Sequence, residues 1–232
     1  MKDKKQAIVI SLGGSLIAEE KINTLFLKEF RKTIKKHLFD KKFIIVCGGG
    51  TTARKYIHSL KENKSDERLQ SFIGIACTRL NARFMSYFFG FEQKKGIPYT
   101  TRTLRKYLKE KGIVFCGALE YKPEQTSDST AAEIARKYKT SLINITNVNG
   151  LYNKDPTKNP DAKLIKKISW KEFNKKAKEI EFKPGQNFVL DQTASEIILK
   201  NSIPTYIIGP EMEQLEKIIQ EKKDFNGTLI RG

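Results

Sequence analysis

The 232-residue sequence has little of what metal sites and disulfide frameworks need. It contains three cysteines, Cys47, Cys77 and Cys116, and two histidines, His37 and His58. The cysteines are odd in number, lack metal-ligand spacing and lie within or beside apolar segments, so we expect buried, reduced thiols in a cytoplasmic protein. The two histidines are too isolated in the sequence to indicate a metal site.

Long hydrophobic runs are also missing. No stretch approaches the roughly 18 apolar residues that a membrane span needs. The opening segment, MKDKKQAIVIS, has charges and a short apolar run, but it has no longer hydrophobic region and no small-residue cleavage site. We expect this run to form a first strand instead of a signal peptide, and we expect no membrane partner.

Negative charge is scarce, because 44 Lys and Arg residues stand against 26 Asp and Glu residues and give a formal net charge of +18. Such an excess attracts polyanions, so nucleic-acid binding has to be weighed. However, the lysines are spread over almost every predicted helix, and no RGG, zinc-knuckle or RNP-type motif accompanies them. We therefore expect a solvated, lysine-rich surface. Attraction of small anionic ligands is the main alternative, and nucleic-acid binding is the weakest.

Apolar runs of strand length alternate with segments of helical periodicity. The sequence predicts strands at 7–12, 43–47, 113–117, 141–148 and 204–209 and a short strand near the end of the chain. It predicts helices at 24–38, 52–61, 72–89, 104–112, 127–139, 190–202 and 212–223. The helix at 72–89 is expected to have an apolar side formed by Ile73, Cys77, Leu80 and Phe84. The alternation predicts an α/β fold with a parallel sheet covered by helices on both faces, and the length allows one large domain or two small ones.

Two glycine clusters follow predicted strands, one in SLGGSL and one in CGGGTTAR. Parallel strands place their carboxyl ends at one edge of the sheet, and glycine there lets an anion approach the backbone near helix N-termini. The segment GGGTTA formally fits the dinucleotide fingerprint G-x-G-x-x-A, but the acidic residues in range lie in a charged linker, and the P-loop pattern is absent. The pair of clusters therefore predicts a phosphate site that neither familiar motif explains.

Two further segments carry polar groups suited to phosphoryl transfer. Asp128 opens a predicted helix, where it could serve as the N-terminal cap or as a carboxylate that orients cations around a transferring phosphoryl group, and both interpretations stay open. Beyond the strand that ends at Thr146, the irregular segment with Tyr152, Asp155 and Lys158 offers a ring for a nucleobase and a cation for phosphate oxygens. An ordinary surface loop is the alternative there.

Seven segments, taken in order, carry a resemblance to a known family: LGGS, CGGGTTARKY, FIGIACTRLNA, TSDSTAAEIA, ITNVNGLYNKDPTKNPDAK, VLDQTASEII and NGTLI. Together they resemble the amino acid kinase family, and within it the archaeal-type uridylate (UMP) kinases, from about residue 7 to 230. The resemblance implies a three-layer αβα sandwich with a mainly parallel central sheet, in a single domain over 1–232. It also implies transfer of the ATP γ-phosphoryl to the phosphate of UMP, with Mg²⁺ accompanying ATP, in a homo-oligomer that is usually a hexamer.

The resemblance also assigns site residues. The residues that it assigns to ATP binding are Gly14, Ser15, Gly50, Arg54, Thr146, Tyr152 and Asp155. UMP binding falls to Gly49, Ser71, Glu120, Tyr121, Lys122, Pro123, Glu124, Gln125, Thr126 and Ser127. Asp128 would be the organising carboxylate and Lys158 the phosphoryl-stabilising lysine, with no metal site formed by the protein alone. The lobe formed by 1–126 would provide the acceptor side, and the lobe formed by 127–232 the ATP side.

Three residues depart from the family pattern. Ser11 stands where many members place a lysine, Ser71 where members use an aspartate on the nucleotide ribose, and Asn149 where an aspartate is usual. The expected acceptor loop, GALEYKPEQTSD, is longer and less glycine-rich than usual. Two alternatives therefore stay open: a sister kinase of the same fold with another small acceptor, and a non-catalytic nucleotide- or oxyanion-binding protein.

Overall fold

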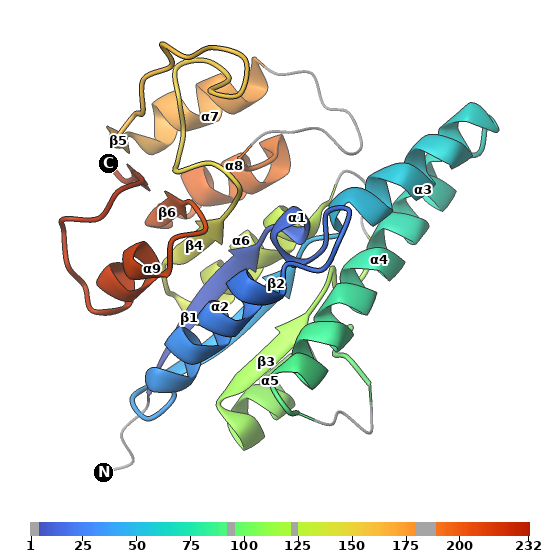
Figure 1. The fold of residues 1–232 in the computed structure, drawn as a ribbon, viewed down its shortest axis with the longest axis horizontal. Helices are drawn as coiled ribbons and strands as arrows, with labels where there is room; N and C mark the ends of the chain where they lie inside the picture. Colours follow the sequence, from blue (N-terminus) through green and yellow to red (C-terminus); the bar gives the residue numbers. More distant parts are fainter. Residues whose placement is uncertain (1–4, 92–95, 122–124, 180–188) are drawn as a thin grey trace.

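The computed structural model describes residues 5–91, 96–121, 125–179 and 189–232. Helices and strands alternate along the chain (Figure 1). In order, the elements are β1 (Gln6–Leu12), α1 (Gly14–Ile17), α2 (Thr24–Lys36), β2 (Lys41–Cys47), α3 (Gly50–Glu62), α4 (Glu67–Phe88), α5 (Thr101–Lys111), β3 (Ile113–Cys116), α6 (Ser127–Tyr138), β4 (Leu142–Ile145), β5 (Lys167–Ile168), α7 (Trp170–Lys178), α8 (Gln192–Lys200), β6 (Thr205–Ile208), α9 (Met212–Ile219) and β7 (Thr228–Ile230).

The central strands are continuous apolar runs, as strands buried on both faces require. β1 is buried from Ile8 to Leu12, and β2 is buried from Phe43 to Cys47. Six of these ten buried residues are Ile or Val, which suit a pleated strand packed on both sides. The two strands lie side by side in parallel, and β4 pairs with the other edge of β1. The hydrophobic core therefore lies on both faces of the sheet.

The sheet has the strand order β3-β2-β1-β4-β6-β7-β5. Every neighbouring pair is parallel except β6–β7, which is antiparallel. The predicted, mainly parallel sheet is thus confirmed. β5 is not predicted from the sequence because its two residues, one of them an exposed lysine, form no apolar run. The strands β1, β2, β3 and β4 all end at one edge of the sheet, where ligands bind in such folds.

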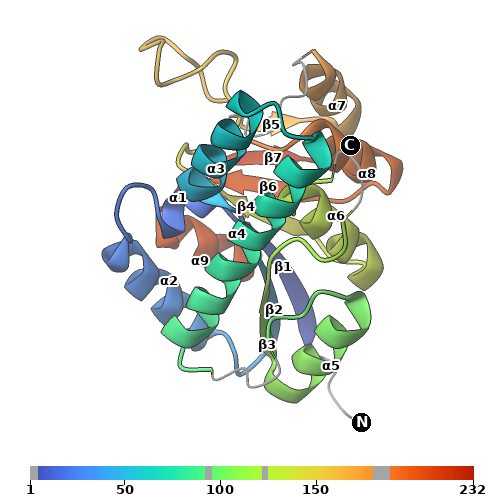
Figure 2. The same ribbon diagram turned by 90° about the vertical axis from the view of Figure 1, so that its right-hand side faces the viewer.

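Helices cover both faces of the sheet, which confirms the predicted three-layer αβα sandwich (Figure 2). The helices α1, α2, α4 and α9 lie on one face, and α5, α6 and α8 lie on the other. α6 packs against β1 and against α8, and α4 packs against β2 and β3. α3 and α4 form a helical hairpin that projects beyond the body of the molecule (Figure 1). The start of α3, which follows β2, and the start of α6 both lie at the carboxyl edge of the sheet.

The helix predicted at 72–89 differs from α4 in its start and in its buried side. α4 begins five residues earlier, after the cap Asp66, whose carboxylate accepts a hydrogen bond from the Arg68 N–H. Cys77 is buried as expected, but Leu80 is 62% exposed, so its place on the buried side is wrong. Thr78 is buried instead, at the point where Gly117, the residue after β3, comes too close to α4 for a side-chain carbon of its own.

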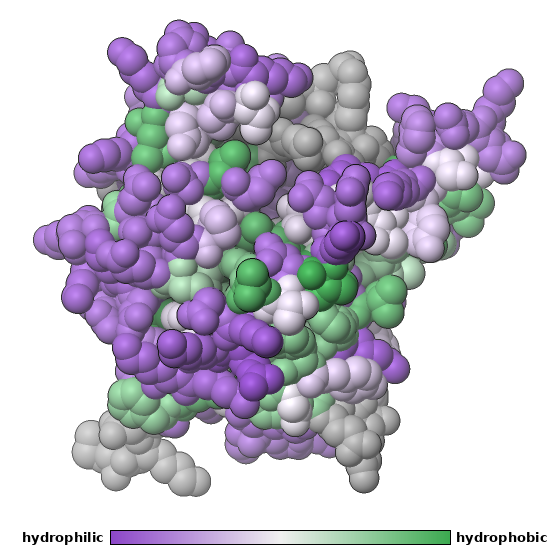
Figure 3. All heavy atoms as spheres, in the orientation of Figure 1, coloured by the Kyte–Doolittle hydropathy of each residue, from purple (hydrophilic) through white to green (hydrophobic). Residues whose placement is uncertain are grey.

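Local sequence features mark the ends of two helices. Gly112 ends α5 in the left-handed conformation with a φ of 72°, and Ser169 with Glu172 forms a capping box at the start of α7. The three cysteines are free and buried. The lysines of α2 and α5 are exposed, and the face drawn in Figure 3 is largely hydrophilic. Across the described ranges, no helix combines the length and the apolar character that a bilayer crossing requires.

Candidate active site

The two glycine loops that follow β1 and β2 touch each other backbone to backbone. A side-chain carbon added to Gly14 would lie 2.6 Å from the Gly50 Cα, and one added to Gly50 would lie 2.7 Å from the Gly14 carbonyl oxygen. Gly50 also has a φ of +67°, which disfavours any residue with a side chain. From α4, the Asn81 amide donates a hydrogen bond to the Gly48 carbonyl oxygen at 2.7 Å. Loop packing itself therefore requires glycine at these positions, in addition to the room for an anion inferred from the sequence.

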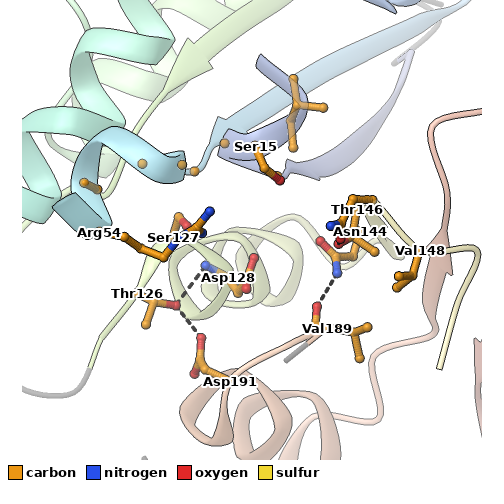
Figure 4. A pocket seen from close by; sticks show the side chains of 18 of the residues that line it. Ser15, Arg54, Thr126, Ser127, Asp128, Asn144, Thr146, Val148, Val189 and Asp191 are labelled. Carbon is orange, nitrogen blue, oxygen red and sulfur yellow. Dashed lines mark hydrogen bonds between the residues drawn. The ribbon is translucent and has the colours of Figure 1, made fainter. Parts of the chain in front are cut away.

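A cleft of about 850 Å³ opens where these loops meet the carboxyl ends of β1, β2 and β4 (Figure 4). Clefts of several hundred cubic ångströms are typical of small-molecule sites. Most of the predicted site residues line it: Gly14, Ser15, Gly49, Gly50, Arg54, Ser71, Tyr121, Gln125, Thr126, Ser127, Asp128, Thr146, Tyr152 and Asp155. Glu120 and Lys158 do not line it. Lys122, Pro123 and Glu124 lie outside the described residues.

Asp128 lies in the first turn of α6, but it is not the cap of this helix. Thr126 is the N-cap, and its hydroxyl accepts hydrogen bonds from the N–H groups of Asp128 and Ser129. The Asp128 carboxylate instead accepts a hydrogen bond from the Ser11 hydroxyl at 2.6 Å. The interpretation of Asp128 as the cap is therefore wrong. Because Thr126 satisfies the helix terminus, the Asp128 carboxylate is available to the cleft.

A second carboxylate, Asp191, lies beside Asp128 and is not singled out from the sequence. It is 5% exposed, and its side chain caps α8 by accepting a hydrogen bond from the Ala194 N–H at 2.7 Å. It also accepts a hydrogen bond from the Thr126 hydroxyl (Figure 4). Asp191 therefore ties the start of α8 to the start of α6. The only sequence signal for it is an aspartate just before a predicted helix in VLDQTASEII, which indicates a cap and not a site.

The two carboxyl groups have raised pKa values. Burial is the largest cause for Asp128, and the nearby charge of Asp191 adds to it, while the Ser11 hydrogen bond acts in the opposite direction. Together these effects raise the pKa of Asp128 to about 7. Burial likewise raises the pKa of Asp191, against the hydrogen bonds that it accepts from Thr126 and Ala194. Two buried carboxylates that repel each other attract cations and donors to the cleft.

Two polar side chains stand at the carboxyl ends of the otherwise apolar central strands. Ser11 of β1 is 1% exposed, and Asn144, its neighbour across the sheet in β4, is 3% exposed. Ser11 bonds Asp128, and the Asn144 amide donates to the Val189 carbonyl oxygen (Figure 4). Buried polar groups of this kind fix a single arrangement only when each has a partner. They hold α6 and the segment before α8 in place under the cleft.

The other wall of the cleft is the segment that follows β4. Thr146, Tyr152 and Asp155 line it, as the sequence predicts. Asp155 accepts hydrogen bonds from the Thr157 N–H and hydroxyl, which lower the pKa of this exposed carboxyl group. Tyr152 pairs with Leu164 in an isolated β-bridge. The loop is therefore ordered by its own contacts and presents a ring and hydroxyl groups to the cleft.

Among the residues that the structure describes, three cationic side chains line the cleft: Arg54 of α3, Lys154 of the loop and Lys176 of α7. Only Arg54 is predicted from the sequence. The Lys154 ammonium donates to Asp161 at 2.6 Å, and the Arg54 guanidinium donates to the Thr51 hydroxyl at 2.9 Å. Lys158 is exposed on the same loop, outside the cleft. The sequence therefore finds the basic loop but does not say which of its lysines faces the site.

The carboxylates can supply part of a magnesium site but not a complete one. In the part of the chain that the structure describes, no group of three or more His, Cys, Asp or Glu side chains could hold a metal ion. Mg²⁺ in nucleotide sites is usually held by one or two carboxylates together with phosphate oxygens and water. Asp128 lines the cleft and fits the first of these requirements.

The pattern of the amino acid kinase family matches residues 6–209. The chain belongs to the amino acid kinase family. Among its relatives, the uridylate kinase of Methanopyrus kandleri is 32% identical over 228 residues, which cover 97% of this chain and 99% of that protein. The uridylate kinase of Thermococcus kodakarensis is 34% identical over 228 residues, which cover 96% of this chain and 98% of that protein. The crystal structure of uridylate kinase from Archaeoglobus fulgidus superposes with a TM-score of 0.80 at 32% identity and covers 96% of this chain and 99% of that chain.

Within this amino acid kinase fold, the departing residues have defined surroundings. Ser11 supports Asp128, as described above. The Ser71 hydroxyl donates to the Glu67 carbonyl oxygen within α4 at 2.9 Å, while the residue still lines the cleft. Asn149 lies against Gly209, where a side-chain carbon would lie 3.3 Å from the Asn149 Cα. Two of the three departures, Ser11 and Ser71, are therefore satisfied by hydrogen bonds inside the protein.

Proposed function

We propose that this protein is an ATP-dependent UMP kinase that transfers the γ-phosphoryl group of ATP to the phosphate of UMP and gives ADP and UDP. Relatives named uridylate kinase match nearly the whole chain. The observation in the site that carries the proposal is the Asp128 carboxylate, free of capping and open to a cleft walled by two glycine loops. Phosphoryl transfer needs positioning and charge stabilisation more than covalent chemistry by the protein, and this arrangement offers both.

We assign the donor side of the cleft to residues that contact the phosphates and nucleoside of ATP. The glycine backbone N–H groups and Arg54 would face the phosphates, and Thr146 and Tyr152 would face the nucleoside. This set is Gly14, Ser15, Gly50, Arg54, Thr146, Tyr152 and Asp155. It lies mainly along the carboxyl ends of β1 and β4 and the start of α3, and all of its members line the cleft.

We assign the acceptor side to Gly49, Ser71 and the segment from Glu120 to Ser127. Of this segment, Tyr121 and the stretch from Gln125 to Ser127 line the cleft. Thr126 is fixed by Asp191, so the hydroxyl and N–H groups at the start of α6 would meet UMP in a set position. The lobes 1–126 and 127–232 would then supply mainly the acceptor and the ATP sides, with the donor glycines of the first lobe lying between them.

In the reaction, a phosphate oxygen of UMP forms a bond to the γ-phosphorus of ATP while the bond from that phosphorus to the β,γ-bridging oxygen breaks. Asp128 would orient the surrounding cations and glycine N–H groups would stabilise the equatorial oxygens. Mg²⁺, when bound with ATP, supplies neutralisation of phosphate charge, and Asp128 is the carboxylate placed to hold it. We propose Lys158 as the lysine that stabilises the transferring phosphoryl group. In the described part of the chain, the lysines that line the cleft are Lys154 and Lys176.

We further propose that the protein acts in the cytoplasm, in pyrimidine nucleotide biosynthesis, as a homo-oligomer that is a hexamer. One side of α4 supports association, because its apolar residues Leu69, Phe72, Leu80 and Tyr87 are between 40% and 62% exposed. An apolar helix side of this kind is typical of a surface that a protein partner covers. We do not propose nucleic-acid binding, because the net positive charge is the only feature that favours it. Light scattering at several protein concentrations tests the hexamer.

The activity itself is tested by ADP release from Mg·ATP in the presence of UMP, CMP, dUMP or a non-nucleotide acceptor. Turnover confined largely to UMP is the expected result. Turnover with another acceptor would still show kinase activity and would indicate that the 118–127 segment selects a different acceptor. Clear ATP binding without turnover with any acceptor would contradict the proposal and favour a binding role.

A further inference from the structure

One side of α4 holds the start of the acceptor-side segment, residues 118–121, through side-chain contacts. The Thr78 hydroxyl accepts a hydrogen bond from the Ala118 N–H at 3.0 Å and donates to the Ile75 carbonyl oxygen at 2.7 Å. Just before it, a side-chain carbon on Gly117 would lie 2.6 Å from the Arg79 nitrogen. The chain that leaves β3 is therefore pressed against α4 with no space between them.

Arg79, the next residue of α4, donates hydrogen bonds to two carbonyl groups of the same segment. Its Nε donates to the Ala118 carbonyl oxygen at 3.2 Å, and its Nη2 donates to the Leu119 carbonyl oxygen. No ion pair of Arg79 with a carboxylate occurs among the residues that the structure describes. The planar guanidinium carries five N–H donors in a fixed fork, so it can bond two successive carbonyl groups at once. A lysine ammonium could not reproduce this geometry.

The segment held in this way faces the cleft, while Arg79 itself does not. Ala118 and Tyr121 line the cleft, and Arg79 lies behind them. Further along, the Tyr121 ring meets the Phe72 ring of α4 edge to face, with 5.1 Å between the ring centroids. The far end of the acceptor-side stretch is fixed separately, because Thr126 donates to Asp191. Arg79 is thus the charged contact at the β3 end of a stretch that is anchored at both ends.

We propose that Arg79 is a positioning residue that determines the affinity for the acceptor by holding the Ala118 and Leu119 carbonyl groups. This inference rests on the proposed function, since the segment from Glu120 to Ser127, which directly follows Ala118 and Leu119, is assigned there to UMP. Hydrogen bonds from a charged donor are stronger than neutral ones, and here they act on the main chain of the loop instead of on the ligand. The side-chain hydrogen bonds of Arg79 within the described residues go to Ala118 and Leu119 and not to donor-side residues, so we expect the effect to be selective for the acceptor.

The test compares Arg79→Met and Arg79→Lys with Arg83→Met, which removes the same charge from the same helix at an exposed position. Steady-state kinetics give the KM values for UMP and for ATP, and amide hydrogen exchange reports on the peptide that covers 113–121. Arg79→Met is expected to raise the KM for UMP about tenfold, with the KM for ATP changed less than about twofold. Arg79→Lys is expected to show the same selective rise, because it keeps the charge and loses the fork. Exchange in the peptide should become faster in both Arg79 variants, and Arg83→Met should match the wild type.

Two results would overturn the inference: an unchanged KM for UMP in both Arg79 variants, or equal rises in the two KM values. If Arg79→Met fails to fold, the comparison of Arg79→Lys with the wild type and with Arg83→Met tests the inference. If the wild type does not phosphorylate UMP, the proposed function fails. The exchange comparison then still decides whether Arg79 holds the segment, since that readout needs no substrate.

Discussion

The Ser11 hydroxyl donates a 2.6 Å hydrogen bond to the Asp128 carboxylate, across 117 residues of sequence. This contact joins the end of the central strand β1 to the first turn of α6. It lowers the pKa of a carboxyl group that burial and the Asp191 charge would otherwise raise further. The ionisation of Asp128 near neutral pH therefore depends on two neighbours that act in opposite directions.

The first prediction concerns the pH dependence of turnover. If ionised Asp128 is required, kcat should rise with pH through an apparent pKa of about 7. Ser11→Ala removes the effect that lowers this pKa, so the acidic limb should move to higher pH. Asp191→Asn removes the neighbouring negative charge, so the limb should move to lower pH. Profiles of kcat from pH 5 to 9 measure both shifts, and movement of both limbs in the same direction would contradict the account.

The same raised pKa makes a prediction about stability. A carboxyl group with a folded-state pKa above its unfolded value of 3.8 favours the folded state below that value, and this contribution is lost as the pH rises towards about 7. Asp128→Asn stays neutral, so it should be more stable than the wild type at pH 8 by about 4 kcal/mol, or about 8–16 °C in Tm, since the pKa is raised from 3.8 to about 7. The difference should disappear near pH 4. Thermal melts at the two pH values measure it, and an equal difference at both would show that the charge is not the cause.

The contact between the glycine loops predicts an unequal response to two similar substitutions. Gly50 and Gly112 both have positive φ values, but only Gly50 has main-chain atoms in the space that a side chain would need. Gly112→Ala should cost about 1 kcal/mol from the backbone conformation alone. Gly50→Ala should cost clearly more and should also reduce turnover, because it pushes the Gly14 loop away. Denaturant unfolding and ADP release compare the variants, and equal losses of stability would remove the loop contact from the explanation.

The lysines of the 154–158 segment and of α7 lead to a prediction about the phosphoryl-stabilising cation. Lys158→Ala should lower kcat far more than it lowers ATP affinity if the sequence interpretation is right. Lys154→Ala and Lys176→Ala serve as the matched comparison, since these two side chains line the cleft and Lys158 does not. Loss of one such cation should reduce kcat about 10²-fold. Normal turnover in Lys158→Ala, together with loss in one of the others, would transfer the role to that lysine.

The sequence is sufficient to predict most of the fold, because the central strands are mainly apolar runs and the glycine loops directly follow β1 and β2. The predictions from sequence are wrong where tertiary packing determines which side chains are buried. Leu80 has the spacing of a buried residue, yet the neighbouring Thr78 takes the buried position because β3 comes close to α4. β5 escapes prediction because two residues carry no periodicity, and only pairing with β7 makes them a strand.

The candidate site is predictable where residues follow one another in the chain, as in the two glycine loops. It is less predictable where partners come from distant segments. The sequence around Asp128 fits a helix cap. Only the folded structure shows that the Asp128 N–H donates to the Thr126 hydroxyl and that Thr126 is therefore the cap. Asp191 and Asn144 enter the site because α8 and β4 converge there. The loop 153–159 offers two lysines, and its folded path decides that Lys154 faces the cleft.

The most direct test of the central claim is the turnover of Asp128→Asn beside the wild type, measured as UDP formed from UMP and Mg·ATP at saturating concentrations near pH 8. Ser11 can still donate its hydrogen bond to the asparagine, so the substitution changes the charge and little of the geometry. We predict UDP formation by the wild type and a loss of at least about 10²-fold in kcat for the variant, with ATP binding retained. Near-normal UDP formation by Asp128→Asn would contradict the account, because phosphoryl transfer would then proceed without the carboxylate around which the site is built.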